Sequence, residues 1–260
     1  MKILLVADVV GRPGREALAA AMPGLRKAHS PDLVIVNVEN LAAGFGVTPR
    51  VVKEVFATGA DVLTSGNHIW DRKEGVALLE EEPRLLRPAN FPPGNPGFGS
   101  IVVTTPAAKV GVLNLQGRVF MTQLVDDPFR VGRRLLDELR AETPVLVVDF
   151  HAEATAEKQA FARYVDGLAS VVVGTHTHVP TADEQVLPGG TAYLSDLGMT
   201  GSHAGVIGHS ADGAIQRAMR QTPIRLEPAE GDLRAQGAVA EVDEKTGRAR
   251  RIERFEVRLG

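Results

Sequence analysis

The chain has 260 residues, with 29 lysine and arginine against 32 aspartate and glutamate side chains and no cysteine. The absence of cysteine excludes a disulfide framework and a thiolate metal site, so any metal would need nitrogen and oxygen ligands. The formal net charge of −3 does not indicate a strongly basic nucleic-acid-binding protein. With 44% hydrophobic and 23% charged residues, the composition is typical of a globular protein and not of a disordered one.

No targeting or membrane segment is expected. The chain starts with MKILLVAD, which is too short for the apolar core of a secretion signal. No stretch approaches the roughly 20 apolar residues that cross a bilayer. We therefore expect a cytoplasmic protein that neither binds membranes nor forms a stable nucleic-acid complex. The sequence leaves the oligomeric state open, and a homo-oligomer is compatible with it.

Short apolar segments alternate with amphipathic ones in the first third of the chain. The expected strands are residues 2–7, 33–38 and 61–64, and the expected helices are residues 14–28, 48–58 and 72–82. A βαβαβα order of this kind predicts a mainly parallel sheet that is covered by helices.

The rest of the chain is more mixed. A loop at 88–99 precedes a hairpin of residues 100–105 and 109–115. Then follow a helix at 127–142, a strand at 145–150, a helix at 155–164 and a strand at 170–174. The chain ends with a helix at 211–220 and an antiparallel pair, 231–242 and 248–257. Because no linker or internal repeat interrupts this order, we predict one α/β domain over residues 1–260, with a sheet that is parallel early and antiparallel late.

Polar residues stand where five of the apolar segments end. They are Asp8, then Glu39 and Asn40, then Asn67 and His68, then His151, and finally His176 and His178. In open parallel sheets the carboxyl ends of the strands form the ligand-binding edge, so these side chains should converge. Carboxylate, amide and imidazole groups suit iron, manganese or zinc. Apart from His68 they make seven candidate ligands, enough for two ions that share a bridging carboxylate.

Each of these residues alone also has an ordinary structural explanation. Asp8 could cap a helix, and Glu39 could be a surface carboxylate. Asn67 follows a glycine, as asparagine often does in turns, and a histidine pair such as His176 and His178 is a weak signal. Because all five segments end in such residues, the metal site is the better interpretation.

The order of these residues resembles the calcineurin-like metallophosphoesterase superfamily. Of the superfamily motifs D-x-H, G-D, G-N-H-[DE], H and G-H-x-H, all but G-D have a counterpart in this order: Asp8, Gly66-Asn67-His68, His151 and Gly174-Thr175-His176-Thr177-His178. The chain departs from the pattern in two places. Val10 stands where the first histidine belongs, and Val38-Glu39-Asn40 replaces the Gly-Asp motif.

These departures are similar to those of the bacterial YmdB-like phosphodiesterases. The likeness extends over essentially the whole chain. It is carried by the first residues, MKILLVADVVGRPG, and by the segments 37–40 (NVEN), 66–71 (GNHIWD), 149–153 (DFHAE), 174–178 (GTHTH) and 196–201 (DLGMTG).

The resemblance implies a metallophosphoesterase-type α/β/β/α sandwich of two mixed sheets flanked by helices. It also implies two ligand sets, Asp8, Glu39, Asn40 and His178 for one metal ion and Glu39, Asn67, His151 and His176 for the second. Asn40 would supply the ligand that Val10 cannot, and His68 would be the general acid. The implied activity is metal-dependent hydrolysis of cyclic nucleotides, 2′,3′-cyclic and/or 3′,5′-cyclic, or of other phosphodiesters. The implied cofactors are two divalent or mixed-valence ions, with iron first and manganese or zinc as alternatives.

Flanking residues are candidates for support of this site. Asp71 could keep His68 protonated or could cap a helix. Asp149, Glu153 and Asp183 could orient the ligating histidines or could be exposed carboxylates. Among the remaining residues, Phe45 is either a base-stacking platform or part of a plain connecting loop. His203 and His209 lie in a loop rich in glycine and serine, from which one of them could reach the mouth of the site, and the sequence assigns no definite role to either.

Two other functions fit the same residues. A phosphomonoesterase, such as a nucleotidase or protein phosphatase, would use the same ligands. A metal- or nucleotide-binding regulator would not need the proton donor His68, which makes it the weaker alternative. The sequence does not distinguish the preferred nucleotide, the ester bond that is cut or the native metal.

Overall fold

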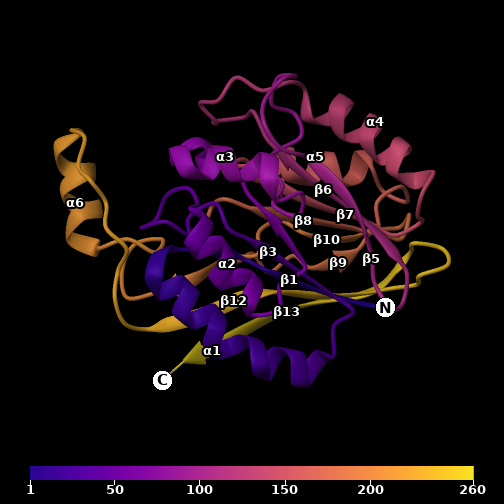
Figure 1. The fold of residues 1–260 in the computed structure, drawn as a ribbon, viewed down its shortest axis with the longest axis horizontal. Helices are drawn as coiled ribbons and strands as arrows, with labels where there is room; N and C mark the ends of the chain where they lie inside the picture. Colours follow the sequence, from indigo (N-terminus) through magenta and orange to yellow (C-terminus); the bar gives the residue numbers. More distant parts are fainter. Residues whose placement is uncertain (260) are drawn as a thin grey trace.

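Two β-sheets lie face to face in the computed structural model, which describes residues 1–259 (Figure 1). The first sheet has the order β2-β11-β12-β1-β3-β4, with β13 paired to β12. Its strands are β1 (Lys2–Val6), β2 (Asp8–Val9), β3 (Leu33–Asn37), β4 (Val62–Thr64), β11 (Met199–Ser202), β12 (Leu233–Val242) and β13 (Ala249–Leu259). On one side of β1 the strand pairs β1–β3 and β3–β4 are parallel, and on the other side the pairs β1–β12 and β12–β13 are antiparallel.

The second sheet has the order β5-β6-β7-β8-β10-β9. Its strands are β5 (Ser100–Thr104), β6 (Lys109–Gln116), β7 (Leu146–His151), β8 (Val171–Thr175), β9 (Gln185–Val186) and β10 (Ala192–Leu194). The strands β6, β7, β8 and β10 are parallel, and an antiparallel strand closes each edge.

Helices cover both outer faces. They are α1 (Gly11–His29), α2 (Pro49–Ala57), the short 3₁₀ helix η1 (Asn67–Trp70), α3 (Lys73–Glu81), α4 (Pro128–Arg140), α5 (Thr155–Tyr164) and α6 (Ala211–Arg220). In Figure 1, α1 and α2 lie on one side of the two sheets and α4 and α5 on the other, while α6 projects from the body. No helix within residues 1–259 is long and apolar enough to span a membrane.

Alternating side chains of the central strands explain the layers. In β1, Leu4 belongs to the same apolar cluster as Leu18 of α1, whereas Ile3 belongs to the cluster that contains Val112 of the second sheet. A third apolar cluster lies between the second sheet and the helices α4 and α5. Because residues two apart on a strand face the same side, one strand can serve two cores at once.

The α/β/β/α fold implied by the family resemblance is confirmed, but the single sheet expected from the apolar segments is wrong. Strands β7 and β8 belong to the second sheet, and not to the sheet of β1, β3 and β4. All five strands are buried on both faces, so their sequences read alike and do not reveal which strands pair. The prediction of one domain over 1–260 includes Gly260, which lies outside the described residues, and it stays a prediction.

Most expected helices and strands are present with shifted ends. Helix α1 begins at Gly11, three residues earlier than expected, with Pro13 in its first turn, where proline is tolerated. The expected hairpins β5–β6 and β12–β13 are both present. Residues 67–70 and the short strands β2, β9, β10 and β11 were not expected, because two- to four-residue elements carry too little periodicity to be recognised.

Candidate metal centre

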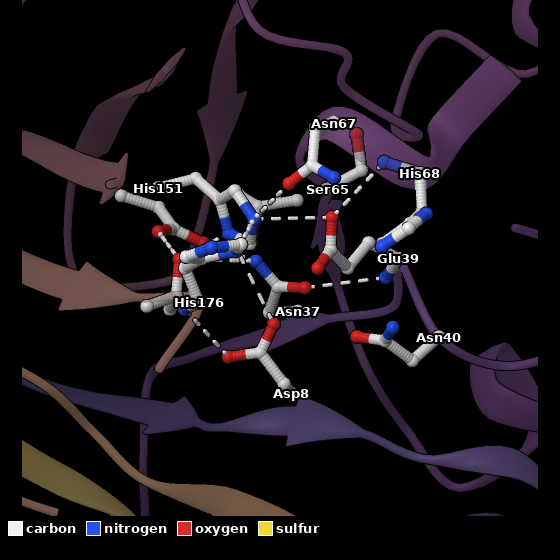
Figure 2. A network of polar contacts seen from close by, with 12 residues as sticks. Asp8, Asn37, Glu39, Asn40, Ser65, Asn67, His68, His151 and His176 are labelled. Carbon is white, nitrogen blue, oxygen red and sulfur yellow. Dashed lines mark hydrogen bonds and ion pairs between the residues drawn. The ribbon is translucent and has the colours of Figure 1, made fainter. Parts of the chain in front are cut away.

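The carboxyl ends of strands from both sheets meet at one place. All seven expected ligands lie there: Asp8 begins β2 just after β1, Glu39 and Asn40 follow β3, Asn67 begins η1 after β4, His151 ends β7, and His176 and His178 follow β8. Figure 2 shows the side chains of Asp8, Glu39, Asn40, Asn67, His151 and His176 turned toward a common centre, with Glu39 in the middle. The convergence therefore involves two packed sheets and not one sheet edge.

The first group of ligand atoms surrounds Nε2 of His151. That nitrogen lies 3.1 Å from Oε2 of Glu39, 3.1 Å from Oδ1 of Asn67 and 3.0 Å from Nδ1 of His176. A single imidazole N–H cannot be shared among three acceptors at once. Ligand atoms bound at about 2.1 Å to one cation lie roughly 3 Å apart, so this arrangement fits a metal ion.

The second group contains Asp8, Glu39 and His178, whose ligand atoms lie within 4.8 Å of one another. Oδ1 of Asp8 and Oδ1 of Asn40 are buried and have no hydrogen-bond partner within the described part of the chain. The amide nitrogen of Asn40 donates to the Gly44 carbonyl at 2.9 Å, which leaves its oxygen turned toward Glu39 and Asp8 (Figure 2). Buried oxygens without partners are costly unless they bind a cation, so this group also fits a metal ion.

The charges of the centre favour a cation. Burial raises the pKa of Asp8, the charge of His151 partly offsets this rise, and the neighbouring carboxylates of Glu39, Asp196 and Asp149 raise the pKa further. Burial opposes ionisation of Glu39, but the charge of His151 outweighs this effect and lowers the pKa of Glu39. In turn, the charge of Glu39 and its hydrogen bond raise the pKa of His151. Carboxylates thus outnumber the cationic side chains, and a metal ion would relieve their repulsion.

Gly66 makes room for this cluster. A Cβ atom at this position would lie 2.2 Å from Nε2 of His151 and 2.3 Å from Oε2 of Glu39. Any larger residue would therefore occupy the space between the ligand atoms. This explains why glycine precedes Asn67 and His68 in the sequence.

Hydrogen bonds on the far side of two histidines turn the Nε2 atom of each ring toward the centre. Nδ1 of His151 lies 2.9 Å from the Thr175 hydroxyl, which itself donates to Asp149 at 2.7 Å. Nδ1 of His178 donates to the Ile207 carbonyl at 2.9 Å. When the rings are neutral, Nε2 carries the lone pair that binds a metal, and partners of this kind orient metal-binding histidines.

His176 is kept neutral by its surroundings. Burial and the nearby His151 lower its pKa to about 3. Its Nε2 lies 3.3 Å from a carboxylate oxygen of Glu153, so Nδ1 is the atom that faces His151. A neutral imidazole has the lone pair that a metal needs.

The loop that carries His176 and His178 is strained and is held by a buried ion pair. Both histidines have positive φ angles, 102° and 63°, which are unusual for residues other than glycine. Between them, the backbone N–H of Thr177 donates to Asp196 at 3.2 Å, and Asp196 also accepts from Lys158 at 2.7 Å. Both partners of this ion pair are 2% exposed, so removing one would leave a buried charge, which typically costs about 3–5 kcal/mol.

His68 lies beside the ligand groups and belongs to neither of them. Its Nδ1 lies 2.7 Å from Oδ2 of Asp71, and its backbone N–H donates to Oε2 of Glu39 at 3.3 Å. Because Asp71 takes Nδ1, the Nε2 atom is the one left to donate a proton elsewhere. The side chain is 29% exposed, so a substrate can reach it.

The other candidates have mixed outcomes. Asp71 contacts His68, as its supporting role requires. Glu153 flanks His151 in the sequence but contacts His176 instead, and Asp149 reaches His151 only through Thr175. The prediction that Asp183 orients His178 is wrong, because Asp183 accepts hydrogen bonds from Thr181 and Ser195.

Three parts of the support were missed in the sequence. They are the hydroxyl of Thr175, the carbonyl of Ile207, and the ion pair of Lys158 with Asp196. Only Asp196 has a signal in the sequence, because it begins the segment DLGMTG, which resembles the YmdB-like phosphodiesterases. A carbonyl contact such as that of Ile207 leaves no trace in side-chain identity.

Phe45, for which the sequence leaves two explanations open, contacts both His68 and His209. The ring of Phe45 lies edge-on to His68, with the ring centroids 4.9 Å apart, and is stacked on His209 at 5.4 Å. His203 is instead near Arg234, which together with burial lowers its pKa.

Known proteins resemble the chain over nearly its whole length. The profile of the family described as "YmdB-like protein" matches residues 4–255. A 2′,3′-cyclic-nucleotide 2′-phosphodiesterase from Bacillus subtilis is 45% identical over 255 residues, which are 98% of this chain and 96% of the relative. Among solved structures, a novel phosphatase from Mycoplasma pneumoniae is 32% identical and superimposes with a TM-score of 0.93. The match covers 99% of this chain and 93% of the phosphatase chain. A hypothetical protein from Thermus thermophilus is 39% identical, with a TM-score of 0.92 and coverage of 99% of both chains.

Proposed function

The chain belongs to the YmdB-like protein family, and we propose that it is a dinuclear-metal phosphodiesterase that opens 2′,3′-cyclic nucleotides. One observation carries the proposal: two groups of ligand atoms that share Glu39, with His68 beside them. The activity of the Bacillus subtilis relative, at 45% identity, supports the same substrate class.

We assign the ligands as two sets. Asp8, Glu39, Asn40 and His178 would hold one ion, and Glu39, Asn67, His151 and His176 would hold the other, with Glu39 bridging. Bound cations at such a site neutralise phosphate oxygens and lower the pKa of water, which supplies the nucleophile. Nitrogen and oxygen donors fit iron, and also manganese or zinc. Iron is our first choice.

The proton for the leaving oxygen comes from His68. Nδ1 of this imidazole is held by Asp71 at 2.7 Å, so Nε2 can donate to the ribose oxygen as its bond to phosphorus breaks. We propose that the 2′ bond is the one that breaks, as the name of the Bacillus subtilis relative indicates for that protein. The product would then be a nucleoside 3′-phosphate.

A comparison of phosphate esters tests this function. The metal-loaded chain is incubated with 2′,3′-cyclic AMP, 3′,5′-cyclic AMP, bis-p-nitrophenyl phosphate and p-nitrophenyl phosphate, and products are separated by chromatography. We expect the 2′,3′-cyclic nucleotide to give adenosine 3′-phosphate, and the diester to react faster than the monoester. Faster release of p-nitrophenolate from the monoester than from the diester would identify a phosphomonoesterase instead. No hydrolysis of any of the four esters would favour a binding protein that is not an enzyme.

A further inference from the structure

The glycine-containing loop after Glu39 and Asn40 is tightly closed. The N–H of Gly46 donates to the Glu39 carbonyl at 2.6 Å, and the N–H of Ala42 donates to the Gly46 carbonyl at 2.8 Å. A further bond ties the Asn40 side chain to the carbonyl of Gly44 at 2.9 Å. The loop therefore fixes two expected metal ligands at one end and presents Phe45 at the other.

Arg72 fixes the same loop from outside. Its guanidinium donates to the Phe45 carbonyl at 3.1 Å and to the Ala42 carbonyl at 2.8 Å. Gly46 allows this approach, because its φ is 70° and a Cβ atom there would lie 2.9 Å from Arg72 and 3.1 Å from the His68 carbonyl. Asp71 and Arg72 are consecutive, so one short segment holds both the His68 ring and the backbone of Phe45.

The ring of Phe45 stands between two histidines. On one side it meets His68 at a ring angle of 63°, and on the other it stacks on His209 at 15°. His209 is 5% exposed and buried, so it is a firm support for Phe45. Since the stacked face of Phe45 is occupied by His209, this ring is badly placed to stack on a nucleobase with that face.

We infer that Phe45 is a positioning residue that holds the imidazole of His68 at the angle required for proton donation. The inference rests on the proposed function. Asp71 fixes only one atom of the ring, Nδ1, and leaves the ring free to tilt about that contact. The contact with Phe45 removes this freedom, and the loop couples the position of His68 to the ligands Glu39 and Asn40. Misplacement of a catalytic group by about 1 Å can cost roughly 10²-fold in rate.

The test uses leaving groups that differ in their need for a proton. A ribose oxygen leaves poorly as an alkoxide, whereas p-nitrophenolate is a stable anion that leaves without a proton. The variants are Phe45→Ala, Phe45→Tyr as the conservative replacement, and Phe98→Ala as a control at a half-exposed phenylalanine without an aromatic partner in residues 1–259. For each variant kcat and KM are measured on 2′,3′-cyclic AMP and on bis-p-nitrophenyl phosphate, together with the metal content.

For Phe45→Ala we expect kcat on the cyclic nucleotide to fall by about 10²-fold, with kcat on bis-p-nitrophenyl phosphate and metal content near those of the unmodified chain. Phe45→Tyr should retain most of the activity that Phe45→Ala loses, and Phe98→Ala should leave kcat and KM on both substrates unchanged. A raised KM for the nucleotide at unchanged kcat would overturn the inference in favour of a substrate contact. Equal losses on both substrates together with lost metal would overturn it in favour of a purely structural role. If the unmodified chain leaves the cyclic nucleotide intact, the proposed function itself fails, independently of Phe45.

Discussion

Replacing Glu39 by glutamine is expected to remove hydrolysis of every phosphodiester and to reduce metal binding more than about 100-fold. Replacing only an outer partner of a metal ligand typically costs 10–100-fold in affinity, and Glu39 is shared by both ligand groups. Glutamine has nearly the same shape but no charge. The measurement is metal content after dialysis against a dilute metal buffer, with circular dichroism to show that the chain is folded.

Glu138→Gln is the matched control for this prediction. Glu138 is exposed on α4, where its only ion-pair partner in residues 1–259 is Arg134 at 2.8 Å. This variant should keep the full metal content and the full rate. A Glu39→Gln chain that retains two metal ions would contradict the assignment of Glu39 as the bridging ligand.

Replacing His68 by asparagine is expected to lower turnover of 2′,3′-cyclic nucleotides by about 10²–10⁴-fold while the metal content stays unchanged. The reason is that His68 contacts Glu39 only through its backbone and has its side chain outside both ligand groups. Steady-state kinetics and elemental analysis of the same preparation measure the two effects separately.

His29→Asn serves as the control for the second variant, because His29 lies at the end of α1, at the opposite end of that helix from the centre. It should behave as the unmodified chain does. If the His68 variant lost metal but kept its turnover, His68 would be a ligand or a structural residue and could not be the general acid.

The residues of the centre could be predicted because each follows an apolar strand. Asp8 and His151 belong to different sheets, yet both stand at strand ends, and the residue types there are those that bind metals. The pairing of the strands could not be predicted, since a strand buried on both faces has no polar side to show its orientation. Only the resemblance to a known family predicted that the strands form two sheets.

The support around the ligands was harder to predict. Asp149 was expected beside His151, but its contact passes through the hydroxyl of Thr175, which nothing in the sequence distinguishes from an ordinary strand threonine. The partner of His178 is a backbone carbonyl, and that of Asp196 is a lysine 38 residues away. Such contacts depend on the tertiary arrangement, and local patterns do not contain it.

We propose that two metal ions held at the meeting point of the two sheets make this chain a phosphodiesterase. The most direct test is elemental analysis of the purified full chain before and after chelation, with 2′,3′-cyclic AMP hydrolysis measured on the same samples. We predict two transition-metal ions per chain, loss of both metal and hydrolysis on chelation, and recovery of both when iron or manganese is added back. Full hydrolysis by a chain that contains no metal would rule out a metal-dependent reaction.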